Sequence, residues 1–416
     1  MKKILNNFNN IFLFFLYLQP FLDITSGILL HFGYNVTISS IIRLLFMFFC
    51  VIYLLFYVKE KKVNTYMMLL GIYFVIYTIT ILIVKGTPAL VYELKNFLTT
   101  YYFIILLLTL IKAYKVEKLK VKNLSIIYVI YLLLVFIPNI FNIGFDSYWH
   151  SKEGMVGWFV SANVVGSILS ILLPIILINI KKINIKLIIL ILINLYVIFS
   201  IGTKVPVLSF LIVILINMFY YTMCLIKKKQ YKKLTIITLP IIIIIVISTM
   251  IFPKTSFYKN IVIHINYLEK KDNGNISKKH IIDHLIFSQR LTFEEKTRKA
   301  YNQATFLEKI FGIGYIENYS TDKVRLKTIE IDYFDIFYRH GIIGFILFFT
   351  PTIYIIYKAI NNTKNINFKN INLLTSIFLI LILALFQGHI FVTPANSIYV
   401  ALILALVYQN NLELKK

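Results

Sequence analysis

Charged residues are scarce in this sequence, and their scarcity excludes most soluble proteins. Asp, Glu, Lys and Arg together make up 15% of the 416 residues, whereas apolar residues make up 59% and the mean hydropathy is +0.79. In a soluble globular domain about a quarter of the residues are charged. The composition therefore indicates a protein embedded in a membrane.

Three further absences restrict the kind of membrane protein that this sequence can encode. The apolar runs lack the alternation of polar and apolar residues that a transmembrane β-barrel requires. There are only two cysteines, Cys50 and Cys224; both are expected near the cytoplasmic ends of their spans, and no disulfide is expected. No small-residue cleavage site follows the first apolar run, which is therefore expected to remain as a transmembrane span.

Apolar runs are abundant instead. A run of about 17–25 apolar residues is long enough to cross a bilayer as a helix. Twelve spans are expected, at roughly 8–30, 37–57, 64–84, 92–111, 123–143, 158–180, 187–201, 204–226, 234–252, 339–357, 371–388 and 393–409. The fold class expected is an all-α polytopic membrane protein with about twelve transmembrane helices.

The positive charge is large, and its placement explains it. Lys and Arg number 43 against 18 Asp and Glu, which gives a net charge of +25. Most lysines gather in alternate loops, such as "KKKQYKK" at 227–233. The positive-inside rule then places both termini in the cytoplasm. We expect a multi-pass protein of the bacterial cytoplasmic membrane, with the lipid bilayer as partner and no nucleic acid.

One long polar segment interrupts the apolar pattern. It divides the chain into residues 1–252 with spans one to nine, an extracytoplasmic cap loop at 253–338, and residues 339–416 with spans ten to twelve and a cytoplasmic tail. Helical patterns at 277–288 and 291–309 and spaced apolar residues favour a folded, partly helical cap over a disordered loop. The glycines of "FGIGY" at 311–315 are typical of a tight turn.

Four stretches carry a resemblance to a known superfamily. They are "EGMVGWFVSANVVGSILSILLP" at 153–174, "SIGTKVPVLSFLIVIL" at 200–215, "SQRLTFEEKTRKAYNQATFLEKIFGIGY" at 288–315 and "IEIDYFDIFYRHGIIGFILFF" at 329–349. In order and in position around the long external loop, they resemble the bacterial O-antigen polymerases (Wzy type) and O-antigen ligases.

The resemblance implies a metal-independent membrane glycosyltransferase without a cofactor. Such an enzyme transfers glycan from an undecaprenyl-diphosphate-linked oligosaccharide to a sugar hydroxyl of another lipid-linked repeat unit. The expected reaction is the polymerisation of O-antigen, capsule or cell-wall polysaccharide at the outer face of the membrane. A chain-length regulator is a candidate partner.

Four residues are candidates for binding the diphosphate: Arg290, Lys204, Arg43 and His389. Arg290 matches the family's loop arginine, and Lys204 its basic residue at an outer turn. Arg43 is a charge within the second span, which by default marks a functional site. His389 is expected at the outer mouth between the last two spans. The alternatives are a solvated arginine for Arg290, a lysine that snorkels to the interface for Lys204, and a structural pair with Asp23 for Arg43.

The acidic boundary at 330–335 supplies candidates for acid–base catalysis. An acceptor hydroxyl is a poor nucleophile, and a carboxylate can take its proton as it attacks. We expect Asp332 or Glu330 to do this beside Arg290, with Asp332 favoured. The alternative is that Asp332 or Asp335 caps the helix that follows. In the ligases a histidine usually occupies the corresponding position, so the acidic residues favour a polymerase.

Other interpretations stay open. An O-antigen-ligase-like transferase, a lipid-linked oligosaccharide flippase and a secondary transporter are also large multi-span proteins. A flippase needs no 80-residue external cap, and a transporter favours repeats and broken helices around a midplane site. The "HIIDH" segment at 280–284 has helical i, i+4 spacing for two metal ligands but no obvious third ligand. No metal site is expected.

Overall fold

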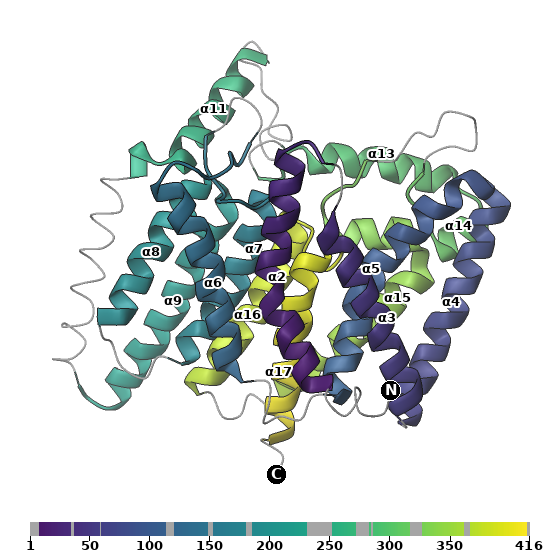
Figure 1. Ribbon diagram of the computed structural model, residues 1–416, viewed down its shortest axis with the longest axis horizontal. Helices are drawn as coiled ribbons and strands as arrows, with labels where there is room; N and C mark the ends of the chain where they lie inside the picture. The colour runs from purple at the N-terminus through teal and green to yellow at the C-terminus, as the bar shows by residue number, and fades with distance from the viewer. Residues whose placement is uncertain are drawn as a thin grey trace.

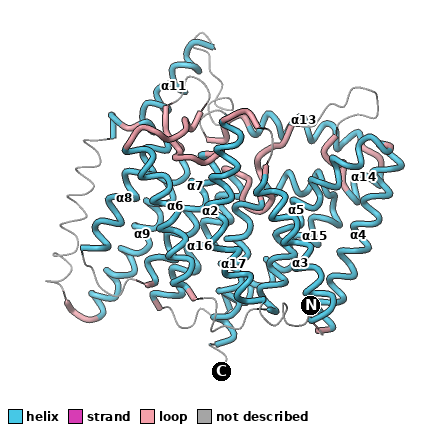
Figure 2. The backbone as a smooth tube through the Cα atoms, viewed as in Figure 1, coloured by secondary structure: helices cyan, strands magenta, loops and turns pink. Residues whose placement is uncertain are grey.

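The computed structural model describes residues 8–34, 37–58, 60–113, 120–148, 153–179, 185–230, 252–271, 283, 286–316, 327–361 and 367–413. Within these ranges the regular structure is helical, apart from an isolated bridge between Asp146 and Met155. Figure 1 shows an upright bundle in which α2 begins and α17 ends at the same end. Loops and short helices gather at the opposite end (Figure 2), which we call the cap end.

Among the described residues, eight helices are long and apolar enough to cross a membrane. They are α2 (Phe8–His31), α3 (Ile38–Tyr57), α4 (Lys61–Lys85), α5 (Thr87–Ala113), α6 (Val121–Ile140), α9 (Lys204–Lys227), α15 (Asp332–Asn361) and α16 (Phe368–Phe386). Two shorter apolar helices, α7 (Ala162–Ile178) and α8 (Ile185–Ile201), lie at the sixth and seventh expected spans. The polytopic helical fold is thus confirmed; the ninth expected span, 234–252, lies outside the described residues except for Phe252.

The last helix forms the centre of the bundle. α17 (Pro394–Glu413) packs along α5, and residues 395–407 of the one and 101–110 of the other are buried throughout. Lipid-facing helices differ from this pair, since α3 and α4 expose large apolar side chains such as Leu45 and Ile83. The expected twelfth span is therefore a helix, but other helices separate it from the lipid.

Besides the ends of the long helices and the short 3-10 helix η1 (Phe252–Lys254), the described part of the cap end carries three helices. They are α11 (Ser256–Lys271), α13 (Arg290–Gln303) and α14 (Phe306–Phe311). The helix expected at 291–309 is broken, because Thr305 and Glu308 form a capping box that starts α14. The sequence analysis did not predict α11. Most of the other expected cap helix, 277–288, lies outside the described residues.

α15 begins before the expected boundary between cap and bundle. It starts at Asp332 rather than 339 and contains a break at Gly341, whose φ is 65° and ψ −174°. A Cβ atom at Gly341 would lie 2.4 Å from the carbonyl oxygen of Ile310. Only glycine tolerates both this backbone conformation and this contact. The break lets the first two turns of α15 pack against the cap.

Candidate functional site

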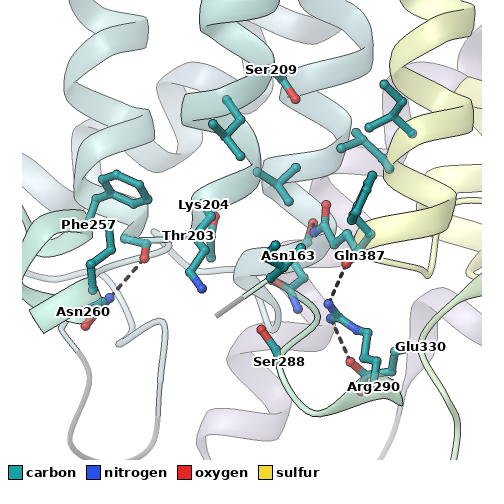
Figure 3. Close-up of a pocket in the computed structure, with 18 of the residues that line it drawn as sticks. Asn163, Thr203, Lys204, Ser209, Phe257, Asn260, Ser288, Arg290, Glu330 and Gln387 are labelled. Atoms are coloured by element: carbon teal, nitrogen blue, oxygen red, sulfur yellow. Dashed lines mark hydrogen bonds and ion pairs between the residues drawn. The ribbon is translucent and has the colours of Figure 1, made fainter. Parts of the chain in front are cut away.

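A cavity of about 460 Å³ opens at the cap end, between α7, α9, α11 and α16. Its charged and polar lining includes Lys204, Arg290 and Glu330, together with Asn163, Thr203, Ser209 and Gln387. Its apolar lining includes Leu208 and Ile212 of α9 and Leu379, Leu383 and Phe386 of α16. In Figure 3, Arg290 and Glu330 lie at one end of the cavity and Ser209 at the other. The cavity thus has a charged end and an apolar end.

Arg290 joins the cap to the bundle at the charged end. Its Nη2 donates to Oε2 of Glu330 at 3.0 Å, and its Nη1 donates to the carbonyl oxygen of Phe386 at 2.8 Å. The arginine side chain is only 8% exposed. Its Nε has no partner among the described residues, so one donor of the guanidinium fork is still unused.

The start of α13 fixes where Arg290 stands. Asp283 accepts hydrogen bonds from the backbone N–H of Leu291 and from the hydroxyl of Thr292. Asp283 therefore caps this helix, which is the role that the structure gives to the acidic residue of "HIIDH". His280 and His284 of that segment lie outside the described residues.

Lys204 is the first residue of α9 and lines the same cavity. The preceding turn requires Gly202, whose φ is 75°. Asn260 of α11 holds this turn, because its amide donates to the carbonyl oxygens of Gly202 and Glu153. The N-terminus of α9 consequently faces the cavity, and its partial positive charge adds to that of Lys204.

Glu330 stands between Arg290 and His389. Besides its contact with Arg290, its Oε1 lies 3.7 Å from Nε2 of His389. Burial alone would raise the pKa of Glu330, but the hydrogen bond and charge of His389 and the charge of Arg290 lower it to about 2. Burial likewise opposes the charge of His389, whereas Glu330, Asp332 and Asp335 raise its pKa above the ordinary value.

The backbone at Glu330 is strained. Its φ is 63°, an uncommon value for a residue other than glycine. Asp335 holds this conformation by accepting the backbone N–H groups of Ile329 and Glu330, and Gly388 packs directly on the Glu330 carbonyl. Strain of this kind gathers at functional sites, where the surroundings enforce a geometry that the chain would not adopt alone.

Asp332 occupies a different environment from Glu330. Its side chain is fully buried, and its carboxylate accepts three backbone N–H bonds, from His389 at 2.6 Å, Ile390 at 2.8 Å and Phe391 at 2.7 Å. Asp332 does not line the cavity, whereas Glu330 does. The first turn of α15 thus anchors the loop that carries His389, and the geometry favours Glu330 over Asp332 for contact with a ligand.

Arg43 belongs to another cluster. Its guanidinium donates to Asp23 at 2.7 Å and to Gln19 at 2.7 Å, and Asp23 also accepts the hydroxyl of Tyr131. The arginine is 4% exposed and does not line the cavity. The structural pair with Asp23, the alternative weighed for this intramembrane charge, is the arrangement observed.

A second buried polar group, which the sequence analysis missed, lies between α4, α5 and α15. We call Lys85, Glu93, Tyr77, Tyr315 and His340 the locking cluster. Lys85 donates to Glu93 at 2.9 Å, and Glu93 also accepts the Tyr77 hydroxyl and the backbone N–H of Tyr315. The Tyr315 hydroxyl lies 2.9 Å from Nε2 of His340. The signal available in the sequence was a lysine and a glutamate eight residues apart at a membrane boundary.

The locking cluster holds the "FGIGY" turn. Gly312 and Gly314 both have positive φ, and a Cβ at Gly312 would lie 2.1 Å from the carbonyl oxygen of Arg339. The tight turn expected for these glycines is therefore present. It packs against α4 and α5 through its bonds to Lys85 and Glu93.

A family comparison agrees with this architecture. The family described as O-antigen ligase like membrane protein matches residues 5–281 and 273–413, which is nearly the whole chain. The chain belongs to this family. Family membership confirms the resemblance drawn from the four motifs and makes the protein a multi-pass membrane protein of a glycan-transferring type. No curated protein matches the chain.

Proposed function

We propose that this O-antigen ligase-like protein is a polysaccharide polymerase. It transfers glycan from an undecaprenyl-diphosphate-linked donor to a sugar hydroxyl of another lipid-linked repeat unit, at the outer face of the cytoplasmic membrane. The observation that carries the proposal is the cavity, because its two ends match the two halves of such a donor. Arg290 and Lys204 line the charged end, and side chains of α9 and α16 line the apolar end.

The charged end suits a diphosphate. Arg290 is nearly buried and keeps an unused donor, and an arginine in a site of low dielectric binds phosphate oxygens strongly. Lys204 and the N-terminus of α9 contribute further positive charge. These groups stabilise the negative charge that develops on the leaving diphosphate as the sugar–phosphate bond breaks.

The apolar end suits the polyprenyl chain. Leu208 and Ile212 on one side and Leu379 and Leu383 on the other come from two candidate membrane spans. A prenyl chain between them exchanges lipid contacts for contacts with aliphatic side chains. The diphosphate then sits at the level of the cap end, where its charge stays near water.

Glu330 is the group that we assign as proton acceptor. The acceptor hydroxyl oxygen attacks the anomeric carbon and forms the new glycosidic bond, while the bond from that carbon to the diphosphate oxygen breaks and its electron pair stays on the diphosphate. The hydroxyl proton passes to Glu330. When Arg290 turns to the diphosphate, Glu330 loses the hydrogen bond and the charge of the guanidinium, and its basicity rises.

A ligase-like transfer is the second candidate, and His389 favours it. The imidazole lies 3.7 Å from Glu330, so the structure supplies a histidine beside the acidic position. A ligase and a polymerase differ in the acceptor and share the donor chemistry.

The test is a reconstituted reaction with the purified protein in lipid. Lipid-linked repeat units supplied alone should yield a ladder of longer lipid-linked glycans, and free undecaprenyl diphosphate should be released in step. Transfer that requires a separate lipid or protein acceptor would replace the polymerase by the ligase. Absence of any transfer with either acceptor would refute the proposal.

A further inference from the structure

Uncharged polar side chains lie in the cavity between its charged end and its apolar end. Asn163 of α7, Thr203 at the start of α9 and Gln387 at the end of α16 line the cavity. Figure 3 shows Asn163 and Gln387 next to each other, beside Arg290. A prenyl chain makes no hydrogen bonds with amide or hydroxyl groups, and a diphosphate can accept hydrogen bonds from them but cannot donate to their oxygens.

Two of these side chains are buried with an oxygen unpaired. Gln387 is 2% exposed; its Nε2 donates to the carbonyl oxygen of Asn163 at 2.6 Å, but its Oε1 has no partner among the described residues. Thr203 is 4% exposed, and its Oγ1 is also without a partner there. Thr203 stands at the N-cap position of α9 yet makes no capping bond with its side chain. Buried oxygens without partners are costly and call for a donor.

The chemistry of these oxygens decides between possible ligands. An amide oxygen accepts hydrogen bonds and cannot donate them. A diphosphate at neutral pH offers only acceptor oxygens, so it cannot satisfy Oε1 of Gln387. A sugar hydroxyl can donate to the amide oxygen and exchange a bond in either direction with the threonine hydroxyl.

We propose that Gln387 and Thr203, with Asn163 beside them, form a subsite for the hydroxyl groups of the lipid-linked glycan. The inference rests on the proposed function, since it places the sugar next to the diphosphate site. The subsite favours the glycan-bearing lipid over the bare lipid diphosphate. A site that hydrogen-bonds a hydroxyl strongly rejects ligands that lack it.

Thr203→Val is the sharpest variant. Valine has the same shape, and the hydroxyl that it removes makes no hydrogen bond within the described structure, so the fold loses no contact. A matched control is Thr352→Val, because Thr352 is 2% exposed on α15 and its Oγ1 is likewise unpaired, but it does not line the cavity. Gln387→Leu extends the test to the amide.

The experiment measures the binding of two lipids to the purified full-length protein in nanodiscs. One lipid is undecaprenyl diphosphate, and the other is the lipid-linked glycan isolated from source cells that lack this protein. We expect Thr203→Val to weaken binding of the glycan lipid by about five- to tenfold and to weaken binding of the bare diphosphate lipid less than this, whereas Thr352→Val should change neither. Equal loss for both lipids, or no loss for either, would overturn the subsite.

The proposed function has a separate point of failure in the same experiment. If the unsubstituted protein bound undecaprenyl diphosphate no better than undecaprenol, the diphosphate site itself would be absent. If it bound the diphosphate lipid selectively but showed no dependence on Thr203 or Gln387, only the glycan subsite would be wrong.

Discussion

The locking cluster and the charged end of the cavity, both at the cap end of the described structure, satisfy their buried charges in opposite ways. In the locking cluster the side chains of Lys85 and Glu93 are 2% and 0% exposed and pair directly with each other. In the cavity Arg290 pairs with Glu330, but Glu330 is 34% exposed and the guanidinium keeps a free donor. The first group is saturated by the protein, whereas the second is only partly satisfied.

This difference separates structural from functional charge. Glu93 accepts hydrogen bonds from a lysine, a tyrosine hydroxyl and the backbone of the "FGIGY" turn, so it has no capacity left for a ligand. The cavity instead combines open hydrogen-bonding capacity with a strained backbone at Glu330. Both groups fix the cap on the bundle, but in the cavity a donor of Arg290 has no partner among the described residues.

Removal of the proton acceptor should give the largest effect on the cavity side. Glu330→Gln keeps the size of the side chain and removes its charge, and we expect transfer to slow by about 10²–10⁴-fold. The turnover rate in the reconstituted reaction should fall while the affinity for undecaprenyl diphosphate changes little. Wild-type turnover would exclude Glu330 from the chemistry.

Asp332→Asn should differ from Glu330→Gln in its effect on stability. Since Asp332 accepts three backbone N–H groups of the His389 loop, we expect this substitution to reduce thermal stability as well as activity, whereas Glu330→Gln should reduce activity with a much smaller loss of stability. The measurement is the melting temperature of both variants in one detergent. If Asp332→Asn lost turnover at unchanged stability, Asp332 rather than Glu330 would be the proton acceptor.

Substitutions in the locking cluster should act by lowering the stability of the fold. Glu93→Ala leaves Lys85 buried without its counter-ion, which costs about 3–5 kcal/mol. The expected result is a lower melting temperature and little folded protein in the membrane. Replacement of both partners, Lys85→Met with Glu93→Leu, should recover part of the stability. If Glu93→Ala were as stable as the unsubstituted protein, the pair would not hold the turn.

The pH response of the cavity should be the smallest effect. His389 has a raised pKa in the folded protein, so its pairing with Glu330 stabilises below the ordinary histidine pKa and is lost as pH rises through the raised value. The Glu330 contribution disappears only as pH falls towards about 2. Because both side chains are about one-third exposed, the change should stay below about 1 kcal/mol.

Thermal denaturation between pH 5 and pH 9 measures this response. The unsubstituted protein should lose a small increment of stability towards the alkaline end. His389→Gln should remove that increment, and a profile that did not change on this substitution would assign the pH dependence to another group.

The sequence singled out three residues that line the cavity, but of the locking cluster it indicated no more than the topology. Arg290, Lys204 and Glu330 could be found because charge of these types at an outer membrane boundary, in a matching motif order, is informative by itself. The distinction between Glu330 and Asp332 could not be found, because the partners of Asp332 come from residues at least 57 positions later in the chain. Lys85 and Glu93 looked like ordinary boundary charges, since their bonds to residues 313–316 form only after the cap folds back.

The same reason limits what the sequence said about the helices. The expected spans follow from apolar length, which is a local property, and most of them are present as helices. The break at Gly341 and the separation of α13 from α14 depend on contacts with other elements and on a capping box that was overlooked. For Arg43 the sequence offered the pair with Asp23 as one alternative, and the fold shows that this pair forms and that Gln19 joins it.

The central claim is that Arg290 binds the donor diphosphate, and one pair of variants tests it most directly. Arg298 lies on the same helix, is 55% exposed and does not line the cavity, so Arg298→Ala is the matched control for Arg290→Ala. In cells, Arg290→Ala should abolish long polymer and leave single lipid-linked repeat units to accumulate, Arg290→Lys should restore only part of the polymer because a point charge replaces a bidentate fork, and Arg298→Ala should behave as the unsubstituted protein. Polymer of normal length from Arg290→Ala, at normal protein level, would contradict the account.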